Sequence, residues 1–349
     1  MLFYIIFIFL LVVLLAEYRI GGRKKPSVLL YIGFLFFYAV LIFRFDVGWD
    51  YPNYYKSVYP TLGDLSHNEP IGKCFFYITD FFHFPPLFFM IVGTISCYFV
   101  FRTLLQSSDS VLLGLLTFLA FFTGMIFSGV RQGMALSVIL FSYRYLTQGK
   151  WLQYILMCVL AGLMHYSAFV CLLFPFLYKF LSSSFRLIMV LSILVIGGKV
   201  MLADIIEQIG YYEGYLTNTD LQGGTILPFV YIAVLLILYI LAMLRKGNES
   251  NKRLIRLALM GTAFPFLLGG HIGTRLCYYF MIYICVFLPN IATQYRTGMR
   301  ICFATCLITL FFGVLYVGKI NPIKNPYMPY RTIFSVDLDH PVFKHDGVN

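Results

Sequence analysis

Long apolar runs separated by short polar stretches follow one another along almost the whole chain of 349 residues. The runs reach about 20 residues, the length that a helix needs to cross a hydrocarbon layer of roughly 30 Å. Within the runs, polar and apolar residues do not alternate with a period of two, as they would in membrane strands. The pattern therefore predicts an all-α, polytopic membrane protein.

The apolar runs predict about twelve transmembrane helices, some of which are short enough to be half-helices. The predicted ranges are 2–16, 27–43, 85–105, 111–127, 132–147, 151–164, 166–180, 185–203, 226–244, 252–269, 274–293 and 299–317. The first run has no basic leader and no small-residue cleavage site, which indicates a retained helix. The segments 151–164 and 166–180 meet at "GLMHYSAF" and fit either two half-helices or one bent helix. The aromatic segment 73–86 is too short to span and is predicted to lie at the interface.

The positions of Lys and Arg predict the orientation. Most of the 26 basic residues fall in alternate loops, which places those loops inside and both termini outside. The prediction is thus a membrane domain over 1–317, with outside loops at 44–84 and 204–225, and an outward-facing tail over 318–349. The net charge of +11 follows from this topology, so no nucleic-acid partner is expected.

Composition supports the membrane assignment and narrows the chemistry. Hydrophobic residues make up 60% of the chain, charged residues only 12%, and the mean hydropathy is +0.83, too apolar for a water-soluble globule. The eight Cys form no CxxC pair, and the six His have no zinc-site spacing. We therefore expect neither a metal nor a cofactor.

Charged and aromatic residues gather on the predicted outer face. They are Arg44, Asp50 and Glu69 in the first outside loop, Arg131 in "FSGVRQGMA", His165 in "LMHYSA", Arg275 after "GGHIGT", and Tyr330 and Arg331 in the tail. Taken singly, each has an ordinary explanation: a lone Arg reaches lipid phosphate, an apolar-flanked His sits in a core, and Tyr or Trp forms an interfacial belt. Those explanations do not account for the gathering of all these types at one face.

The chemistry of this set predicts a site for an anionic, lipid-borne, sugar-like substrate. Arg binds diphosphate with its planar fork of donors. Aromatic faces suit sugar rings. A carboxylate or a His accepts the proton of an attacking hydroxyl.

The sequence also resembles a known family. "RFDVGWDYPNY" resembles the R…VGxDYxxY signature of EpsG-like proteins, the Wzy-type polymerases of capsule, exopolysaccharide and O-antigen pathways in bacteria. Similar motifs follow in the family's order: "NEPIGKCFFYITDF", "VRQGMALSVILFSYRYL", "LAGLMHYSAFV", "GTRLCYYF" and "NPYMPYRTIF". The resemblance covers nearly the whole chain, although the helix around Arg275 lacks some of the expected aromatic pattern.

The resemblance implies a membrane glycosyltransferase at the outer face of the bacterial cytoplasmic (inner) membrane. Such an enzyme transfers a glycan from undecaprenyl diphosphate to the terminal sugar hydroxyl of another lipid-linked repeat unit. The leaving group is already activated, so no nucleotide site is needed, and Arg side chains can replace a metal. A chain-length regulator and a flippase of the same pathway are the protein partners that the resemblance suggests.

Site roles follow from joining the chemistry with the resemblance. We expect Arg131 and Arg275, assisted by Arg44, to bind diphosphate. The candidate bases are His165, Asp50 and Glu69; His165 is preferred because an imidazole titrates near pH 6.5, close to neutral. The glycan is expected to contact Trp49, Tyr51, Tyr54, Tyr55, Tyr330 and Arg331.

Other functions remain open at this stage. A flippase or transporter for lipid-linked sugars would place polar groups near the bilayer midplane and often shows inverted repeats, neither of which is apparent here. A membrane acyltransferase would use a His but has less need of several outward Arg. An O-antigen ligase or a sugar transferase that uses polyprenyl phosphate is the nearest alternative.

Overall fold

Helices account for most of the chain in the computed structural model, which describes residues 28–57, 69–194, 227–245, 248–268, 270–320, 330–338 and 340–343. The elements, in order, are α2 (Val28–Ile42), β1 (Arg44–Phe45), α3 (Tyr51–Lys56), α4 (Pro70–Phe81), α5 (Pro86–Ser107), α6 (Val111–Phe127), α7 (Val130–Phe141), α8 (Tyr143–Thr147), α9 (Trp151–Met164), the 3₁₀ helix η2 (Tyr166–Leu173), α10 (Phe174–Phe180), a helix over Ser184–Leu194, α13 (Leu227–Leu244), α14 (Glu249–Gly261), α15 (Phe264–Leu267), α16 (Gly270–Met281), α17 (Ile284–Ala292), α18 (Thr297–Ile320) and β2 (Arg331–Thr332).

Many of the predicted helices are present close to their predicted bounds. The predictions 27–43, 85–105, 111–127, 151–164 and 226–244 correspond to α2, α5, α6, α9 and α13. The segment 73–86, predicted to lie at the interface, falls mostly in the helix α4 and ends at the first residue of α5. The predicted helix 2–16, the end of 185–203 and the outside loop 204–225 lie outside the described residues.

Four runs predicted as single helices are each divided in two, among them 166–180, which becomes the 3₁₀ helix η2 and α10. The prediction 132–147 becomes α7 and α8, 252–269 becomes α14 and α15, and 274–293 becomes α16 and α17. Pro265 explains the division of 252–269, because a proline at the start of α15 cannot donate the bond that would continue α14. Apolar patterning predicts the run but does not reveal such interruptions.

Helix length and composition give one clear candidate for a membrane span within the described residues, Pro86–Ser107. The pair Ile272–Met281 and Ile284–Ala292, bent by 48°, is a second candidate if it counts as one span. Several shorter apolar helices of 10–17 residues surround them. This helical, apolar chain is consistent with a membrane protein.

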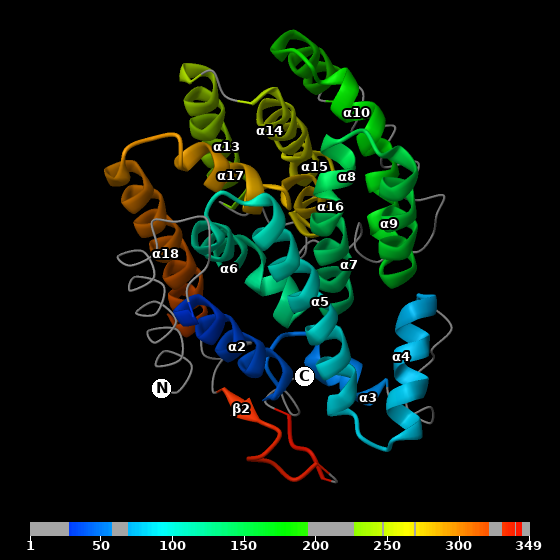
Figure 1. Cartoon of the computed structure of the whole chain (residues 1–349). Coiled ribbons are helices and arrows are strands. Elements are labelled where there is room, and N and C mark those ends of the chain that lie inside the picture. Colours follow the sequence, from blue (N-terminus) through cyan, green and yellow to red (C-terminus); the bar gives the residue numbers. More distant parts are fainter. Residues whose placement is uncertain are drawn as a thin grey trace.

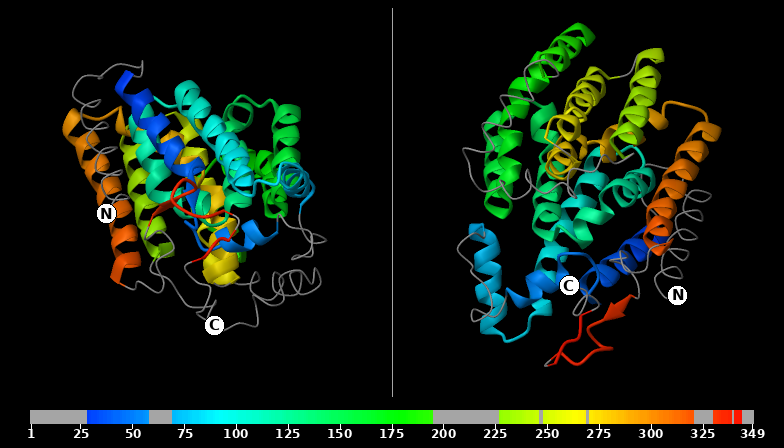
Figure 2. Two further views of the ribbon diagram at one scale, coloured as in Figure 1. Left: turned by 90° about the horizontal axis from the view of Figure 1, so that it is seen from below. Right: turned by 180° about the vertical axis from the view of Figure 1, so that it is seen from behind.

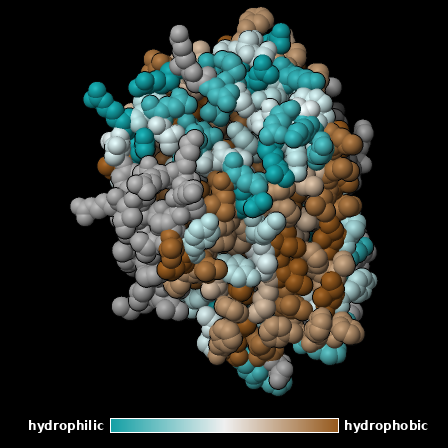
Figure 3. Space-filling model, in the orientation of Figure 1, coloured by the Kyte–Doolittle hydropathy of each residue, from teal (hydrophilic) through white to brown (hydrophobic). Residues whose placement is uncertain are grey.

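The helices α5, α6 and α7 occupy the middle of the molecule, with the others packed around them (Figure 1). α9 and η2 pack against α7, α17 and α18 pack against α6, and α2 packs against α5. α3, α4 and β2 lie together at the lower end of Figure 1, and the view from behind in Figure 2 agrees. Figure 3 shows hydrophilic side chains gathered at the opposite, upper end, above a mainly hydrophobic flank.

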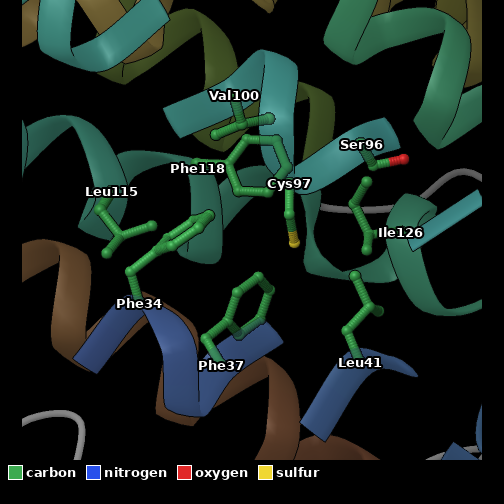
Figure 4. Close-up of a pocket in the computed structure, with 9 residues that line it drawn as sticks. All are labelled: Phe34, Phe37, Leu41, Ser96, Cys97, Val100, Leu115, Phe118 and Ile126. Carbon is green, nitrogen blue, oxygen red and sulfur yellow. The ribbon is translucent and has the colours of Figure 1, made fainter. Parts of the chain in front are cut away.

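The contact between α2, α5 and α6 is a dry, apolar packing region (Figure 4). A narrow gap there is lined by Phe34, Phe37, Leu41, Ser96, Cys97, Val100, Leu115, Phe118 and Ile126. The gap is too small for a water molecule, and the Ser96 hydroxyl donates to the Val92 carbonyl oxygen at 2.8 Å. This region therefore supports the fold and offers no ligand site.

Candidate functional site

The loop between α2 and α3 lies on the break between α6 and α7. Gly48 has a φ of +114°, and a Cβ added to it would lie 2.0 Å from the carbonyl oxygen of Phe127. Only glycine adopts this conformation and permits this approach without strain. The neighbouring backbone N–H of Trp49 donates to Ser128 Oγ at 3.1 Å. These contacts place the start of α3 beside the N-terminus of α7.

The C-terminal segment supports the same loop from the other side. β2 pairs antiparallel with β1, which joins parts of the chain that the sequence analysis placed on one face. The Tyr55 hydroxyl donates to the carbonyl oxygen of Leu338 at 3.0 Å, and the rings of Phe45 and Phe343 stack with centroids 5.7 Å apart. The loop that leads to the site is therefore supported by residues near both ends of the described chain.

The carboxylate of Glu69 is the centre of the candidate active site. Glu69 is 1% exposed. Its Oε1 lies 2.7 Å from Nδ1 of His165 and accepts a longer bond of 3.4 Å from the backbone N–H of Tyr166. Its Oε2 forms an ion pair with the guanidinium of Arg131. One buried carboxylate thus connects three segments that are far apart in the sequence.

Local structure explains how these three side chains meet. Glu69 directly precedes α4 in an extended conformation, and Pro70 begins the helix. Arg131 lies in the first turn of α7, and α7 packs against α9. His165 occupies the extended residue between α9 and η2, where the chain turns. Gly72 in α4 leaves room for Arg131, whose Cδ would lie only 3.3 Å from an added Cβ.

The partners of Glu69 keep it ionised. Burial by itself would raise the pKa of Glu69. The hydrogen bond with His165 and the positive charge of Arg131 outweigh burial, so the pKa is lowered below its usual value. A charged Glu69 holds Nδ1 of His165 as a donor and leaves Nε2 as the ring nitrogen that can take a proton.

A cavity of about 200 Å³ opens beside this cluster. The residues that line it are Asp50, Asn53, Tyr54, Ser57, Gly129, Arg131, Gln132, His165 and Arg275. The guanidinium of Arg131 lies over the ring of Tyr54, 5.3 Å from its centroid, as in a cation–π contact. The cavity therefore combines basic, acidic, aromatic and amide side chains.

Asp50 and Arg275 complete the charged lining. Burial raises the pKa of Asp50, while the positive charges of Arg275 and then Arg131 oppose the rise. Asp50 and Arg275 form no ion pair within 4.0 Å in the described part of the chain, so their charges act across the cavity.

Five of the predicted site residues line the cavity or its wall, namely Asp50, Tyr54, Arg131, His165 and Arg275, and Glu69 lies directly behind them. The carboxylate of Glu69 binds His165 and Arg131 and is not among the residues that line the cavity.

Arg44, Tyr51 and Tyr55 do not reach the cavity, although the sequence suggested contacts with substrate. Arg44 is 2% exposed and donates to the carbonyl oxygen of Ile126 at 3.2 Å. Tyr51 is fully buried and stacks on Phe89 at 3.9 Å, and Tyr55 is nearly fully buried. In this structure they hold the loop in place.

Trp49, Tyr330 and Arg331 also lie outside the cavity lining. Trp49 is 45% exposed, whereas the Tyr330 hydroxyl donates to the carbonyl oxygen of Val40 at 2.8 Å. Arg331 donates to the carbonyl oxygen of Val342 at 2.9 Å. The tail thus approaches the loop of the site without lining the cavity.

Sequence reasoning missed Asn53, Ser57, Gly129 and Gln132 as lining residues. Asp50, Asn53, Tyr54 and Ser57 are spaced i, i+3, i+4 and i+7, which is one face of a helix. A predicted helix at α3 would have revealed Asn53 and Ser57. Among the described residues, no three His, Cys, Asp or Glu side chains gather in a way that could hold a metal ion.

Comparison with known proteins identifies the family. No curated protein and no solved structure matches the chain significantly. The family model described as the EpsG family matches residues 27–332, a range that includes every residue of the cavity. The chain therefore belongs to the EpsG family, a family of Wzy-type polymerases.

Proposed function

We propose that this protein is a polysaccharide polymerase that transfers a glycan from undecaprenyl diphosphate to the terminal sugar hydroxyl of a second lipid-linked repeat unit. The observation that carries the proposal is the Glu69, His165 and Arg131 cluster at the wall of a cavity that also contains Arg275 and Asp50. Family membership supports a reaction of the polysaccharide polymerase type.

His165 acts as the general base in this proposal. The acceptor oxygen attacks C1 of the donor sugar and its proton passes to Nε2 of His165. Glu69 accepts from Nδ1 and stabilises the imidazolium that forms, as a carboxylate does for the His of a catalytic triad. Asp50 is the alternative base, because its raised pKa brings it closer to the working pH.

Arginine side chains stabilise the leaving group. The bond between C1 and the diphosphate oxygen breaks, and its electron pair stays on undecaprenyl diphosphate. A guanidinium has five N–H donors, so Arg131 can bind Glu69 and an anion at once. Arg275 faces the same cavity, and the N-terminus of α7 beside it adds the positive end of a helix dipole. No metal is required for this charge stabilisation, and we expect polymerisation to persist in EDTA.

The glycan contacts follow the cavity lining. Tyr54 is the aromatic residue of the predicted set that lines the cavity, and it offers one ring to a sugar. Exposed Trp49 is the second candidate for a sugar contact, farther along the glycan.

The enzyme is proposed to sit in the cytoplasmic (inner) membrane with about twelve spans, both termini and the site outside. Apolar helices and the distribution of Lys and Arg support this topology. Reporter fusions test it: those at Ser66, Asn218 and the C-terminus are expected outside and one at Asn248 inside. A flippase and a chain-length regulator of the same pathway are the proposed partners.

Deletion of the gene combined with His165→Ala tests the function. In a deletion host, we expect the ladder of long surface glycans to disappear while single-repeat material remains. Loss of all repeat material would instead indicate a flippase. With purified lipid-linked repeat units, His165→Ala is expected to polymerise at least about 100-fold more slowly at equal protein amount. His340→Ala, which changes an exposed His in the tail, is the matched control and is expected to polymerise normally.

A further inference from the structure

One side of the short helix α3 lines the cavity. Asp50, which directly precedes the helix, lines it together with Asn53, Tyr54 and Ser57. Their spacing of i, i+3, i+4 and i+7 places the four side chains on the same side of the helix. We refer to these four residues as the α3 wall of the cavity.

The other side of α3 is fixed in the core. The ring of Tyr51 is fully buried and stacks on Phe89, with the centroids 3.9 Å apart. Tyr55 is 2% exposed, and its hydroxyl donates to the carbonyl oxygen of Leu338 at 3.0 Å. Because these contacts hold the helix in one orientation, the α3 wall presents its side chains to the cavity from a fixed support.

Charge differs between the α3 wall and the rest of the lining. Both arginines of the cavity come from other helices, Arg131 from α7 and Arg275 from α16, whereas the charged residue of the α3 wall is Asp50. A diphosphate is attracted to the arginines and repelled by an ionised carboxylate. A ligand with an anionic part and a hydroxyl-rich part therefore binds with its hydroxyls toward α3.

Asn53 contributes hydrogen-bond donors to the α3 wall. It is exposed, and no hydrogen bond joins its side-chain amide to another residue in the part of the chain that the structure describes. The Ser57 hydroxyl donates to the backbone carbonyl oxygen of Asn53 at 2.7 Å, so toward a ligand it acts as an acceptor. An ionised Asp50 also only accepts. The Asn53 amide, with two donors and one acceptor, suits neighbouring polar groups on a sugar ring.

The size of the cavity limits which part of the substrate it holds. Its volume of about 200 Å³ is smaller than the roughly 300–1,000 Å³ of sites for drug-sized ligands. A whole repeat unit therefore extends beyond it. With the diphosphate on the arginines, the part of the donor that lies nearest to α3 is the sugar ring joined to that diphosphate.

We propose that the α3 wall binds the sugar ring joined to the diphosphate, and that Asn53 is its specificity-determining residue, binding polar groups of that ring through its side-chain amide. The inference rests on the proposed function, which supplies the class of substrate. It adds which part of the cavity recognises the sugar. A site that hydrogen-bonds a substrate group discriminates against analogues that lack this group.

Two kinds of lipid diphosphate separate recognition of the sugar from recognition of the diphosphate. The first probe is farnesyl diphosphate, which carries no sugar. The second kind is farnesyl diphosphate that carries one glucose, galactose, N-acetylglucosamine or N-acetylgalactosamine. Isothermal titration calorimetry measures their affinities for the full-length protein in nanodiscs. For the wild type, we expect at least one sugar-bearing probe to bind about 10-fold more tightly than farnesyl diphosphate.

Variants assign this gain in affinity to one residue. Asn53→Leu keeps the size of the side chain and removes its polar atoms, so the gain from the sugar is expected to fall below about 3-fold, with the affinity for farnesyl diphosphate unchanged. Arg275→Gln is expected to weaken both kinds of probe by a similar factor and to leave the gain intact. Gln148→Leu changes an exposed amide outside the cavity and is the control, expected to bind both as the wild type does.

Two results would overturn the inference while leaving the proposed function in place. One is an Asn53→Leu protein that keeps the wild-type gain from the sugar. The other is a wild type that binds farnesyl diphosphate but gains no affinity from any of the four sugars. A wild type that binds neither kind of probe would overturn the proposed function as well, so the two failures are distinguishable.

Discussion

Arg44 and Arg131 flank the same break between α6 and α7, yet their surroundings differ in kind. Arg44 donates to the carbonyl oxygen of Ile126 at the end of α6 and lies over the ring of Phe127, 4.8 Å from its centroid. Arg131 follows the break, binds Glu69 and lines the cavity. The comparison teaches that a helix break provides two positions for an arginine: one binds backbone oxygens, and the other faces the cavity.

The largest expected effect comes from Arg131→Lys. Lysine keeps the positive charge but loses the planar fork, so a diphosphate clamp should fail while lipid contact would survive. We expect polymerisation from purified lipid-linked units to slow about 100-fold to 1,000-fold, with the protein still folded. Arg296→Lys, at an exposed position on the opposite predicted face, is the control. Wild-type glycan ladders from Arg131→Lys would contradict a diphosphate role.

Arg44→Lys sharpens the comparison of Arg44 with Arg131, because it should change the stability of the protein and not the rate of polymerisation. Lysine cannot reproduce the bond to Ile126 and the stacking on Phe127 together, and its charge remains buried. We expect the free energy of unfolding to fall by about 2–3 kcal/mol, seen as a Tm several degrees lower in a thermal-shift assay. Activity per folded molecule should stay within about 3-fold of the wild type. An unchanged Tm together with lost activity would instead indicate that Arg44 contacts the substrate, as the sequence suggested.

Glu69→Gln tests the carboxylate that connects Arg131 to His165. The pKa of Glu69 is lowered in the folded protein, so its contribution to stability is complete above the unfolded value near 4.5 and is lost as pH falls through the folded value. At pH 7 we expect the variant to be less stable by about 2 kcal/mol. The Tm difference from the wild type should shrink below pH 4.5. A Tm difference between the variant and the wild type that stays constant down to pH 3 would show that the charge of Glu69 is not the cause of the lost stability.

Asp50→Asn has the smallest expected effect of these variants. Its effect on stability has the opposite sign to that of Glu69→Gln. Burial raises the pKa of Asp50, so its ionised form destabilises the folded protein at neutral pH and ceases to do so once the group is protonated in acid. The variant should therefore have an equal or slightly higher Tm at pH 7. With His165 as the base, the rate should fall less than about 10-fold. A loss as large as that of His165→Ala would identify Asp50 as the base.

Much of the fold follows from the sequence because membrane thickness and apolar periodicity determine where helices form. The helices α2, α5, α6, α9 and α13 are of this kind. Interruptions such as the one between α16 and α17 are not visible, because apolar and aromatic residues continue without a break from Leu276 to Leu288. They depend on packing between distant segments.

The residue types of the candidate site were predictable from the sequence. Which of those residues line the cavity and which are buried in the core was not. Residue types and their order placed His165, Arg131 and Glu69 on one face, and these three side chains are in contact in the structure. Whether Tyr51 faces a ligand or the core depends on Phe89, nearly 40 positions away, and no local pattern contains that information. The same holds for Gln132, whose partner is the backbone of Arg275.

The pairing of β1 with β2 also constrains when the protein becomes active during its synthesis. The hydrogen bond from Tyr55 to Leu338 spans 283 residues, so the loop that carries Asp50 and Tyr54 cannot acquire this support until Leu338 has left the ribosome. At about 5–20 residues per second, that interval is tens of seconds. Nascent chains should therefore enter the membrane before this loop has its final support, with the cavity incomplete.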